Sequence, residues 1–266
     1  MGRLEDKIIV ITGGAGGIGY CASRIFAQEG ATVLILDLDE KNGADTLREI
    51  AEAGGKARFY PVDISDFDAV QEVFRQIGAE FGYIDGLYNN ASVFWGQKDA
   101  PLDDLDMDIF RRIVSINLFG LVYCSKCAIP LMKARGGAIV NTASSAAVIG
   151  IPKCDSYTAS KGGTVALTRS MAVEYGPVGI RTNCIAPAAI RTPMVAESDL
   201  DDPDFDEHLF LTQGTPVRRW GKPEEIARTA MFLLSDDSSY INGAILVADG
   251  GITINQVKTS GDQKRK

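Results

Sequence analysis

The sequence predicts one doubly wound α/β domain, in which helices cover both faces of a parallel sheet. Two observations predict it. Short apolar runs alternate with helical patterns along nearly the whole chain, and a glycine-rich turn joins the first run to the first helix. The short runs are continuously apolar, as expected for parallel strands that are buried on both faces.

The first half of the chain supplies four of the expected strands. β-Branched and other apolar residues mark the runs, and apolar residues at helical spacing lie between them. We expect strands at residues 8–12, 32–36, 57–60 and 86–88, and helices at residues 17–29, 39–53 and 67–81. Ser65 and Asp68 have the spacing of a capping box at the start of the third helix.

The second half continues the same alternation. We expect helices at residues 107–132, 157–175 and 223–234, and strands at residues 138–141, 181–185 and 244–247. Pro223, followed by Glu224 and Glu225, is typical of a helix start. No linker or repeat interrupts residues 1–254, which we expect to form a single domain, and residues 255–266 read as a polar, flexible tail.

Composition excludes several classes of function. The 266 residues carry a net charge of −8, which disfavours nucleic acid as a partner. His208 is the single histidine, so no multi-histidine metal site can form, and we expect no metal. Five scattered cysteines fit reduced thiols in the cytoplasm. The N-terminus lacks a secretory pattern, and no apolar run approaches the ~20 residues that span a membrane.

The glycine-rich turn, with the acid that follows the next expected strand, predicts a dinucleotide site. Glycines at residues 13–19 let the backbone approach a pyrophosphate at a helix N-terminus, although a plain flexible turn has the same composition. Asp37 lies where a carboxylate accepts hydrogen bonds from ribose hydroxyls, although an ordinary loop acid would look alike. An acid there repels the 2′-phosphate of NADP, and Leu38 follows it in place of a cation, so NAD is the favoured cofactor.

A tyrosine and a lysine provide candidate proton-transfer chemistry. Tyr157 and Lys161 are four residues apart and share one face of the expected helix. A tyrosine with its ordinary pKa of about 10 is a poor base at neutral pH, but a neighbouring cation favours the phenolate. A surface Tyr–Lys pair would have the same spacing.

At these residues the chain resembles the classical short-chain dehydrogenase/reductase family, and the resemblance covers nearly its whole length. Five motifs occur in the family's order. They are Thr12-Gly13-x-x-x-Gly17-x-Gly19, Asn89-Asn90-Ala91-Ser92, Asn117, Ser144, and Tyr157-x-x-x-Lys161. Ser92 and, later in the chain, Ala188 stand where the family usually has glycine.

The resemblance implies a catalytic set of four residues. Tyr157 would act as general acid/base, and Ser144 would hydrogen-bond the substrate oxygen. Lys161 would bind the nicotinamide ribose and lower the pKa of the tyrosine. The backbone carbonyl of Asn117 would hold a water that links Lys161 to solvent.

The resemblance also implies which residues hold NAD. It assigns the glycine loop to the pyrophosphate, two acids and their neighbours to the adenosine, and the segment after the sixth strand to the nicotinamide. These residues are Gly13, Gly17, Ile18, Gly19, Asp37, Leu38, Asp63, Ile64, Asn90, Ala91, Tyr157, Lys161, Pro187, Ile190 and Thr192.

Residues that flank the catalytic motifs are candidates for the substrate pocket, although ordinary core packing would explain them equally. They are Val93, Trp95, Ser145, Cys154 and Met194. The resemblance also implies a substrate lid at about residues 188–214, where residues 197–207 hold seven carboxylates and no cation, although an ordinary solvated loop would have the same composition. His208 is expected at the surface.

Together these features predict an NAD-dependent oxidoreductase that interconverts a secondary alcohol and its ketone. The expected substrate is an alicyclic or otherwise hydrophobic small molecule, or a ring diol. An NADPH-dependent 3-ketoacyl-type reductase is the alternative enzyme, and an NAD-binding scaffold protein is the non-enzymatic one. Family resemblance suggests a homotetramer.

Overall fold

The computed structural model describes residues 2–196 and 205–255 and confirms the predicted fold class. Seven parallel strands form one sheet in the order β3-β2-β1-β4-β5-β6-β7. The strands are β1 (Ile8–Thr12), β2 (Thr32–Asp37), β3 (Lys56–Pro61), β4 (Gly86–Asn89), β5 (Gly137–Thr142), β6 (Ile180–Pro187) and β7 (Ile245–Ala248). Since β1 lies between β2 and β4, the strand order reverses at β1, which opens a crevice beyond the carboxyl ends of these strands.

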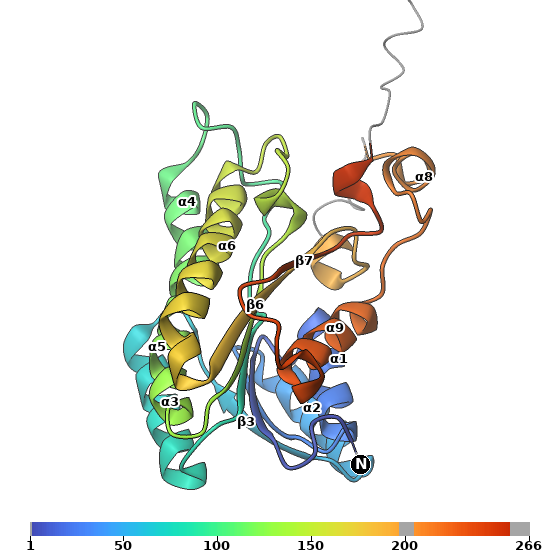
Figure 1. Cartoon of the computed structure of the whole chain (residues 1–266). Coiled ribbons are helices and arrows are strands. Elements are labelled where there is room, and N and C mark those ends of the chain that lie inside the picture. Colours follow the sequence, from blue (N-terminus) through green and yellow to red (C-terminus); the bar gives the residue numbers. More distant parts are fainter. Residues whose placement is uncertain (1, 197–204, 256–266) are drawn as a thin grey trace, which may run out of the picture.

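Helices cover both faces of the sheet (Figure 1). The long ones are α1 (Gly17–Gln28), α2 (Glu40–Glu52), α3 (Phe67–Phe81), α4 (Met107–Val114), α5 (Gly120–Met132), α6 (Asp155–Tyr175) and α9 (Pro223–Leu234). Short turns are η1 (Ser115–Phe119), η2 (Ser145–Ala147), η3 (Gly176–Val178), α7 (Pro193–Val195), α8 (Glu207–Leu209), η5 (Phe210–Gly214), η6 (Asp236–Ser238) and η7 (Ile252–Ile254).

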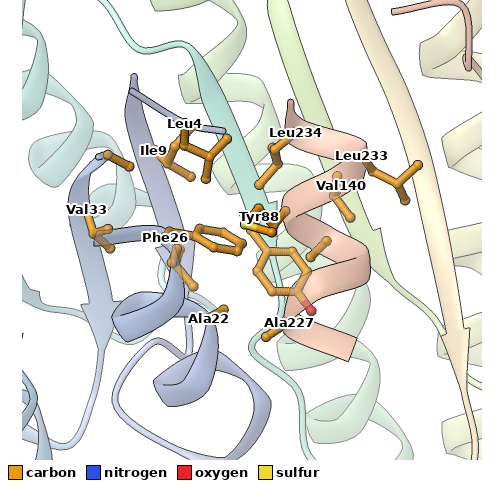
Figure 2. Close-up of a cluster of buried hydrophobic side chains, with 14 of the residues drawn as sticks. Leu4, Ile9, Ala22, Phe26, Val33, Tyr88, Val140, Ala227, Leu233 and Leu234 are labelled. Atoms are coloured by element: carbon orange, nitrogen blue, oxygen red, sulfur yellow. The ribbon is translucent and has the colours of Figure 1, made fainter. Parts of the chain in front are cut away.

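The side chains of β1 show why helices pack on both faces of the sheet. Ile9 and Ile11 point into a core with α1 and α9, whereas Ile8 and Val10 point into a second core with α3, α5 and α6. In the first core, the ring centroids of Phe26 and Tyr88 are 6.2 Å apart (Figure 2). The continuous apolar strands are therefore explained by burial on two sides.

Two sequence expectations need correction. The cap of α3 is Asp66, whose side chain accepts from the backbone N–H groups of Asp68 and Ala69. Ser65 precedes this cap, and its hydroxyl donates to Asp63 and accepts from Arg112, so the predicted capping box does not form. The second correction concerns the helix at residues 107–132, which contains the π-helical turn η1 and is not one regular α-helix.

That composite helix also bears on membrane association. By length and mean hydropathy alone, the helix Met107–Met132 meets the criterion for a membrane-spanning helix. It is not a continuous apolar run, because Asp108, Arg111, Arg112 and Lys126 interrupt it. In the fold, its residues Cys124, Ala128 and Met132 are buried in the core against the sheet and α3. A core helix of this kind passes the same length and hydropathy test.

Candidate active site

The glycine turn between β1 and α1 forms the floor of the crevice. Gly13 and Gly17 have φ angles of +64° and +50°, which favour glycine. A Cβ atom on Gly13 would lie 2.8 Å from the Cα atom of Ala91, and one on Gly19 would collide with the carbonyl oxygen of Gly13. The turn therefore requires glycine at three of the predicted cofactor-binding positions, and Ile18 lines the cavity beside them.

The segment after β4 fastens this turn. The side-chain amide of Asn90 donates to the carbonyl oxygens of Thr12 and Gly13, at 3.2 and 3.3 Å. The backbone N–H groups of Asn90 and Ala91 both donate to the Thr12 hydroxyl. Thus Asn90 and Ala91 line the cavity and also hold the glycine turn in position.

Asp37 ends β2 at the opposite wall. Its carboxylate accepts from the backbone N–H of Ala15 at 2.9 Å and from that of Asp39 at 3.1 Å. Asp37 and its neighbour Leu38 line the cavity, and the Leu38 side chain is 64% exposed. The acid that was expected to select the cofactor is therefore rigidly held beside the glycine turn.

Asp63 and Ile64 lie beyond β3 on the same side of the cavity. The Asp63 carboxylate accepts from the Ser65 hydroxyl at 2.6 Å and from Arg112 at 3.0 Å. Desolvation raises its pKa, but these hydrogen bonds and the Arg112 charge outweigh that effect and hold the pKa below its ordinary value. Asp63 therefore stays ionised and is able to accept hydrogen bonds.

The predicted proton-transfer residues meet at the carboxyl ends of β5 and β6. Ser144 follows β5, and Tyr157 lies in the first turn of α6; both line the cavity. Lys161 lies one turn beyond Tyr157, with its Nζ atom 5.5 Å from the tyrosine ring centroid. The spacing of four residues thus places a cation next to the phenol, as the sequence predicts.

Lys161 is buried, with 1% of its surface exposed, and its ammonium donates to the carbonyl oxygen of Thr142 at 2.9 Å. Burial lowers its pKa to about 8. Lys161 is therefore still largely protonated at neutral pH and close to the range in which it exchanges protons.

This lowered pKa predicts a pH-dependent stability. Between pH 8 and the ordinary lysine value of 10.5, the unfolded chain binds the proton that the folded protein has lost, so the free energy of unfolding rises with pH. From pH 8 to pH 10.5, the free energy of unfolding of wild type should rise by roughly 1–3 kcal/mol relative to that of a Lys161→Met control. Urea unfolding of both proteins across the range measures it; a difference that does not change with pH would contradict the buried ammonium.

Asn117 sits in η1, the π-helical turn between α4 and α5. Its side chain accepts from the backbone N–H of Val93 at 2.8 Å and donates to the carbonyl oxygen of Val93 at 2.9 Å. Its amide also contacts the Ser160 hydroxyl at 3.3 Å. Asn117 thus connects the segment after β4 to α6. Single π-turns of this kind are frequent at functional sites.

The end of β6 and the segment that follows line the cavity with Pro187, Ile190 and Thr192, the residues expected to contact a nicotinamide. Ala188 does not adopt a positive φ angle; the left-handed conformation falls on Ala189, with a φ angle of +52°. The carbonyl oxygen of Ala189 accepts from Gly221, which fastens this unusual turn.

One cavity of about 790 Å³ is lined by the glycine turn, Asp37, Asp63, Ser144, Tyr157 and the residues at and after the end of β6, whereas Gly19, Asn117 and Lys161 are not among its lining residues. Of the five candidate pocket residues, Val93, Ser145, Cys154 and Met194 line it. Trp95 is outside the lining, and its ring faces the ammonium of Lys98; Phe94 occupies the wall instead. A sequence pattern alone does not distinguish between two adjacent aromatic residues in a loop.

The far wall contains Phe210, which lies within the expected lid, and Trp220, which the sequence analysis did not single out. Phe210 and Trp220 line the cavity, and their ring centroids are 5.1 Å apart. The indole of Trp220 donates to Glu207 at 2.6 Å. His208 is exposed and outside the lining, and residues 197–204 of the expected lid lie outside the described residues.

A family model described as "Enoyl-(Acyl carrier protein) reductase" (adh_short_C2) matches residues 13–253. The chain belongs to the short-chain dehydrogenase/reductase family. Among relatives of this family, cis-4-hydroxycyclohexanecarboxylate dehydrogenase of Sinomonas cyclohexanicum is 40% identical over 93% of this chain and 97% of that protein. The 2,5-dichloro-2,5-cyclohexadiene-1,4-diol dehydrogenase of Sphingobium indicum is 38% identical over 95% of this chain and 99% of that protein.

Solved structures of the short-chain dehydrogenase/reductase family match as well. Levodione reductase superimposes with a TM-score of 0.89 at 36% identity, covering 95% of this chain and 99% of its own. Carveol dehydrogenase of Mycobacterium avium was solved with NAD (TM-score 0.89, 28% identity, 96% and 100% covered). A gluconate 5-dehydrogenase of Burkholderia cenocepacia was solved with NADP. It superimposes with a TM-score of 0.88 at 31% identity, covering 96% of this chain and 98% of its own. The chain is thus an oxidoreductase of a family that uses nicotinamide cofactors.

Proposed function

We propose that the protein is an NAD-dependent oxidoreductase that interconverts a neutral, hydrophobic, cyclic secondary alcohol and its ketone. The observation that carries the proposal is one cavity that is lined at one end by the glycine turn and Asp37, and at the other by Ser144 and Tyr157. A dinucleotide and a small alcohol therefore have adjoining places in a single volume.

The residues at the first end fit a dinucleotide. A Cβ atom on Gly16 would meet nothing within 4 Å, and one on Gly17 would approach only the Thr192 side chain, at 3.7 Å, so open space lies against the turn. Among the described residues, no side chain caps α1 and no acid lies in its first turn, so its N–H groups suit a pyrophosphate. Asp37 suits the ribose hydroxyls of NAD and repels the extra phosphate of NADP.

When bound, the nicotinamide supplies the carbon that accepts or donates hydride. Pro187, Ile190 and Thr192 would hold it against the reacting alcohol, while Leu38, Asp63 and Ile64 would hold the adenosine. Tyr157 would remove the proton from the alcohol oxygen during oxidation and return it during reduction, and Ser144 would orient that oxygen by a hydrogen bond.

Lys161 would serve Tyr157 in two ways. Its positive charge lies against the tyrosine ring and favours the phenolate form. It would also bind the nicotinamide ribose and pass protons toward solvent through a water on the Asn117 carbonyl. The lowered pKa of Lys161, about 8, supports this role, since a group near neutrality exchanges protons readily.

The walls of the cavity support a neutral, apolar substrate. Within the described part of the chain, the charged residues that line it are Asp37 and Asp63, both at the adenosine end. Phe94, Met194 and Trp220 form apolar walls at the other end. Burial of apolar surface would thus be the main source of substrate affinity, and a substrate carboxylate would find no cation among the described lining residues.

A substrate panel tests this proposal. We expect NADH formation with cyclic secondary alcohols such as cyclohexanol, and a kcat/KM at least about tenfold lower for the matching alcohol that carries a carboxylate, because its charge would be desolvated without a partner. The absorbance of NADH reports both. A preference for the alcohol that carries a carboxylate would refute the neutral-substrate proposal. The comparison is informative because the Sinomonas relative is named for a carboxylate-bearing alcohol, whereas the Sphingobium relative is named for a diol without that group.

An NADPH-dependent 3-ketoacyl-type reductase is the second candidate, favoured by the acyl-carrier-protein substrate in the description of the matching family model. Asp37 argues against NADP, and the seven carboxylates of residues 197–207 would repel an acidic carrier. Faster reduction of a 3-ketoacyl thioester with NADPH than of cyclic ketones with NADH would favour this candidate. An NAD-binding scaffold would bind the cofactor and turn over neither the 3-ketoacyl thioester nor the cyclic ketones.

We also propose a cytoplasmic homotetramer with a single catalytic domain at residues 1–254 and a substrate lid at about residues 188–214. None of the five cysteines, all in the described residues, forms a disulfide. Exposed apolar side chains support self-association: Phe119 in η1, Val173 in α6, and Val247 in β7. Sedimentation of the purified protein tests the oligomeric state.

A further inference from the structure

Asp99 is a buried acid that the proposed mechanism does not use. It lies in the loop between β4 and α4, and 6% of its surface is exposed. Buried carboxylates are costly unless they are hydrogen-bonded, so this one needs an explanation. Its partners belong to the helix that carries the catalytic tyrosine.

The Asp99 carboxylate binds the first turn of α6. One oxygen accepts from the backbone N–H of Ser156 at 3.1 Å, and the other accepts from the backbone N–H of Tyr157 at 2.9 Å. These N–H groups have no acceptor within the helix, because the first four N–H groups of any α-helix lack one. Asp99 therefore caps α6 from a position 58 residues away from Tyr157.

This remote cap differs from the others in the described chain. Helices α2, α3, α4 and α8 are each capped by the aspartate that directly precedes them: Asp39, Asp66, Asp106 and Asp206. The residue before α6 is Cys154, whose side chain has no oxygen to accept these hydrogen bonds. A carboxylate from the loop takes its place, and its charge suits the positive end of a 21-residue helix.

The same loop is joined to α6 and to the cavity wall by further contacts. The backbone N–H of Leu102 donates to Asp155 at 3.0 Å, so loop and helix each accept from the other. The N–H of Asp99 donates to the carbonyl oxygen of Trp95 at 2.8 Å, which closes a turn next to Phe94. The Phe94 ring, which lines the cavity, lies 4.8 Å from the Tyr157 ring.

We propose that Asp99 is a positioning residue that sets the location of Tyr157 and of the aromatic substrate wall together. Its carboxylate binds the Tyr157 backbone, and its own backbone N–H closes the turn that follows Phe94. Since a displacement of about 1 Å at a reacting group costs up to about a hundredfold in rate, loss of this carboxylate should impair catalysis without removing any group that reacts. The inference rests on the proposed role of Tyr157.

Two substitutions test it, with a matched control. Asp99→Asn keeps the shape and one acceptor but turns an NH₂ group toward a helix N–H, and Asp99→Leu removes both acceptors. We expect kcat for alcohol oxidation to fall about 10- to 100-fold in Asp99→Asn, and further in Asp99→Leu, with the KM for NAD changed less than about twofold. Asp106→Asn is the matched control, because it makes the same change at the local cap of α4 in the same loop. Asparagine caps a helix as well as aspartate does, so this variant should keep wild-type kcat.

Amide hydrogen exchange supplies a readout that needs no substrate. The amides of Ser156 and Tyr157 should exchange at least about tenfold faster in the Asp99 variants and unchanged in Asp106→Asn. Should Asp99→Leu fail to fold, the isosteric Asp99→Asn carries the test. Wild-type kcat per folded site in Asp99→Asn, or unchanged exchange of these amides, would overturn the inference. Absence of alcohol turnover in wild type would instead overturn the proposed function, while the exchange comparison still decides how the helix is held.

Discussion

Replacement of Tyr157 by phenylalanine should lower kcat by about 10²- to 10⁴-fold, the usual contribution of a general acid/base. The substitution removes the hydroxyl that would exchange a proton with the substrate, and it keeps the ring that packs 4.8 Å from Phe94. NADH binding should remain within about threefold of wild type, because the glycine turn and Asp37 are untouched.

Fluorescence titration with NADH and initial rates with a cyclic alcohol measure the two quantities separately. Phe94→Leu is a suitable comparison, since it alters the ring contact and keeps the hydroxyl; its effect should fall mainly on the KM for the alcohol. Retention of wild-type kcat in Tyr157→Phe would remove Tyr157 from the mechanism.

The second large effect is expected in cofactor choice. Wild type should prefer NAD over NADP by about 10- to 1000-fold in kcat/KM, because a carboxylate and a phosphate a few ångströms apart repel each other by about 1–4 kcal/mol. Asp37→Asn removes the charge and retains an acceptor for the N–H of Ala15. The preference should shrink at least about tenfold, mainly through a better KM for NADP.

Initial rates with both cofactors at matched concentrations measure this preference. Asp39→Asn is the control, because it removes a neighbouring charge at the cap of α2 and leaves asparagine, which also caps well. A wild-type preference for NADP would contradict the assignment of Asp37, and so would an Asp37→Asn enzyme with an unchanged ratio.

The strands and the long helices could be predicted because their signal is local. Residues 8–11 of β1 are all apolar, and each is buried by one helical layer or the other. The motifs at Tyr157 and Lys161 depend on helical spacing, which the folded helix keeps. Such features need no knowledge of distant segments.

The remaining features depend on contacts between distant segments or on small geometric differences. The choice of Phe94 over Trp95 as the wall depends on how one loop turns, and the place of Trp220 depends on a hydrogen bond to Glu207. No local pattern distinguishes Asp99 from the other acids of its loop, since its partners lie 57 and 58 residues away. The cap at Asp66 was missed because the nearby Ser65 offered an equally good pattern.

Deuterium transfer from a labelled alcohol tests the central claim most directly. A cyclic secondary alcohol with deuterium on its carbinol carbon is incubated with enzyme and NAD, and the products are analysed by mass spectrometry. The account predicts one ketone for each NADH formed, with the deuterium on the NADH and none in water, because hydride passes directly between the two carbons. Ketone without reduced cofactor, or reduced cofactor without the label, would contradict it.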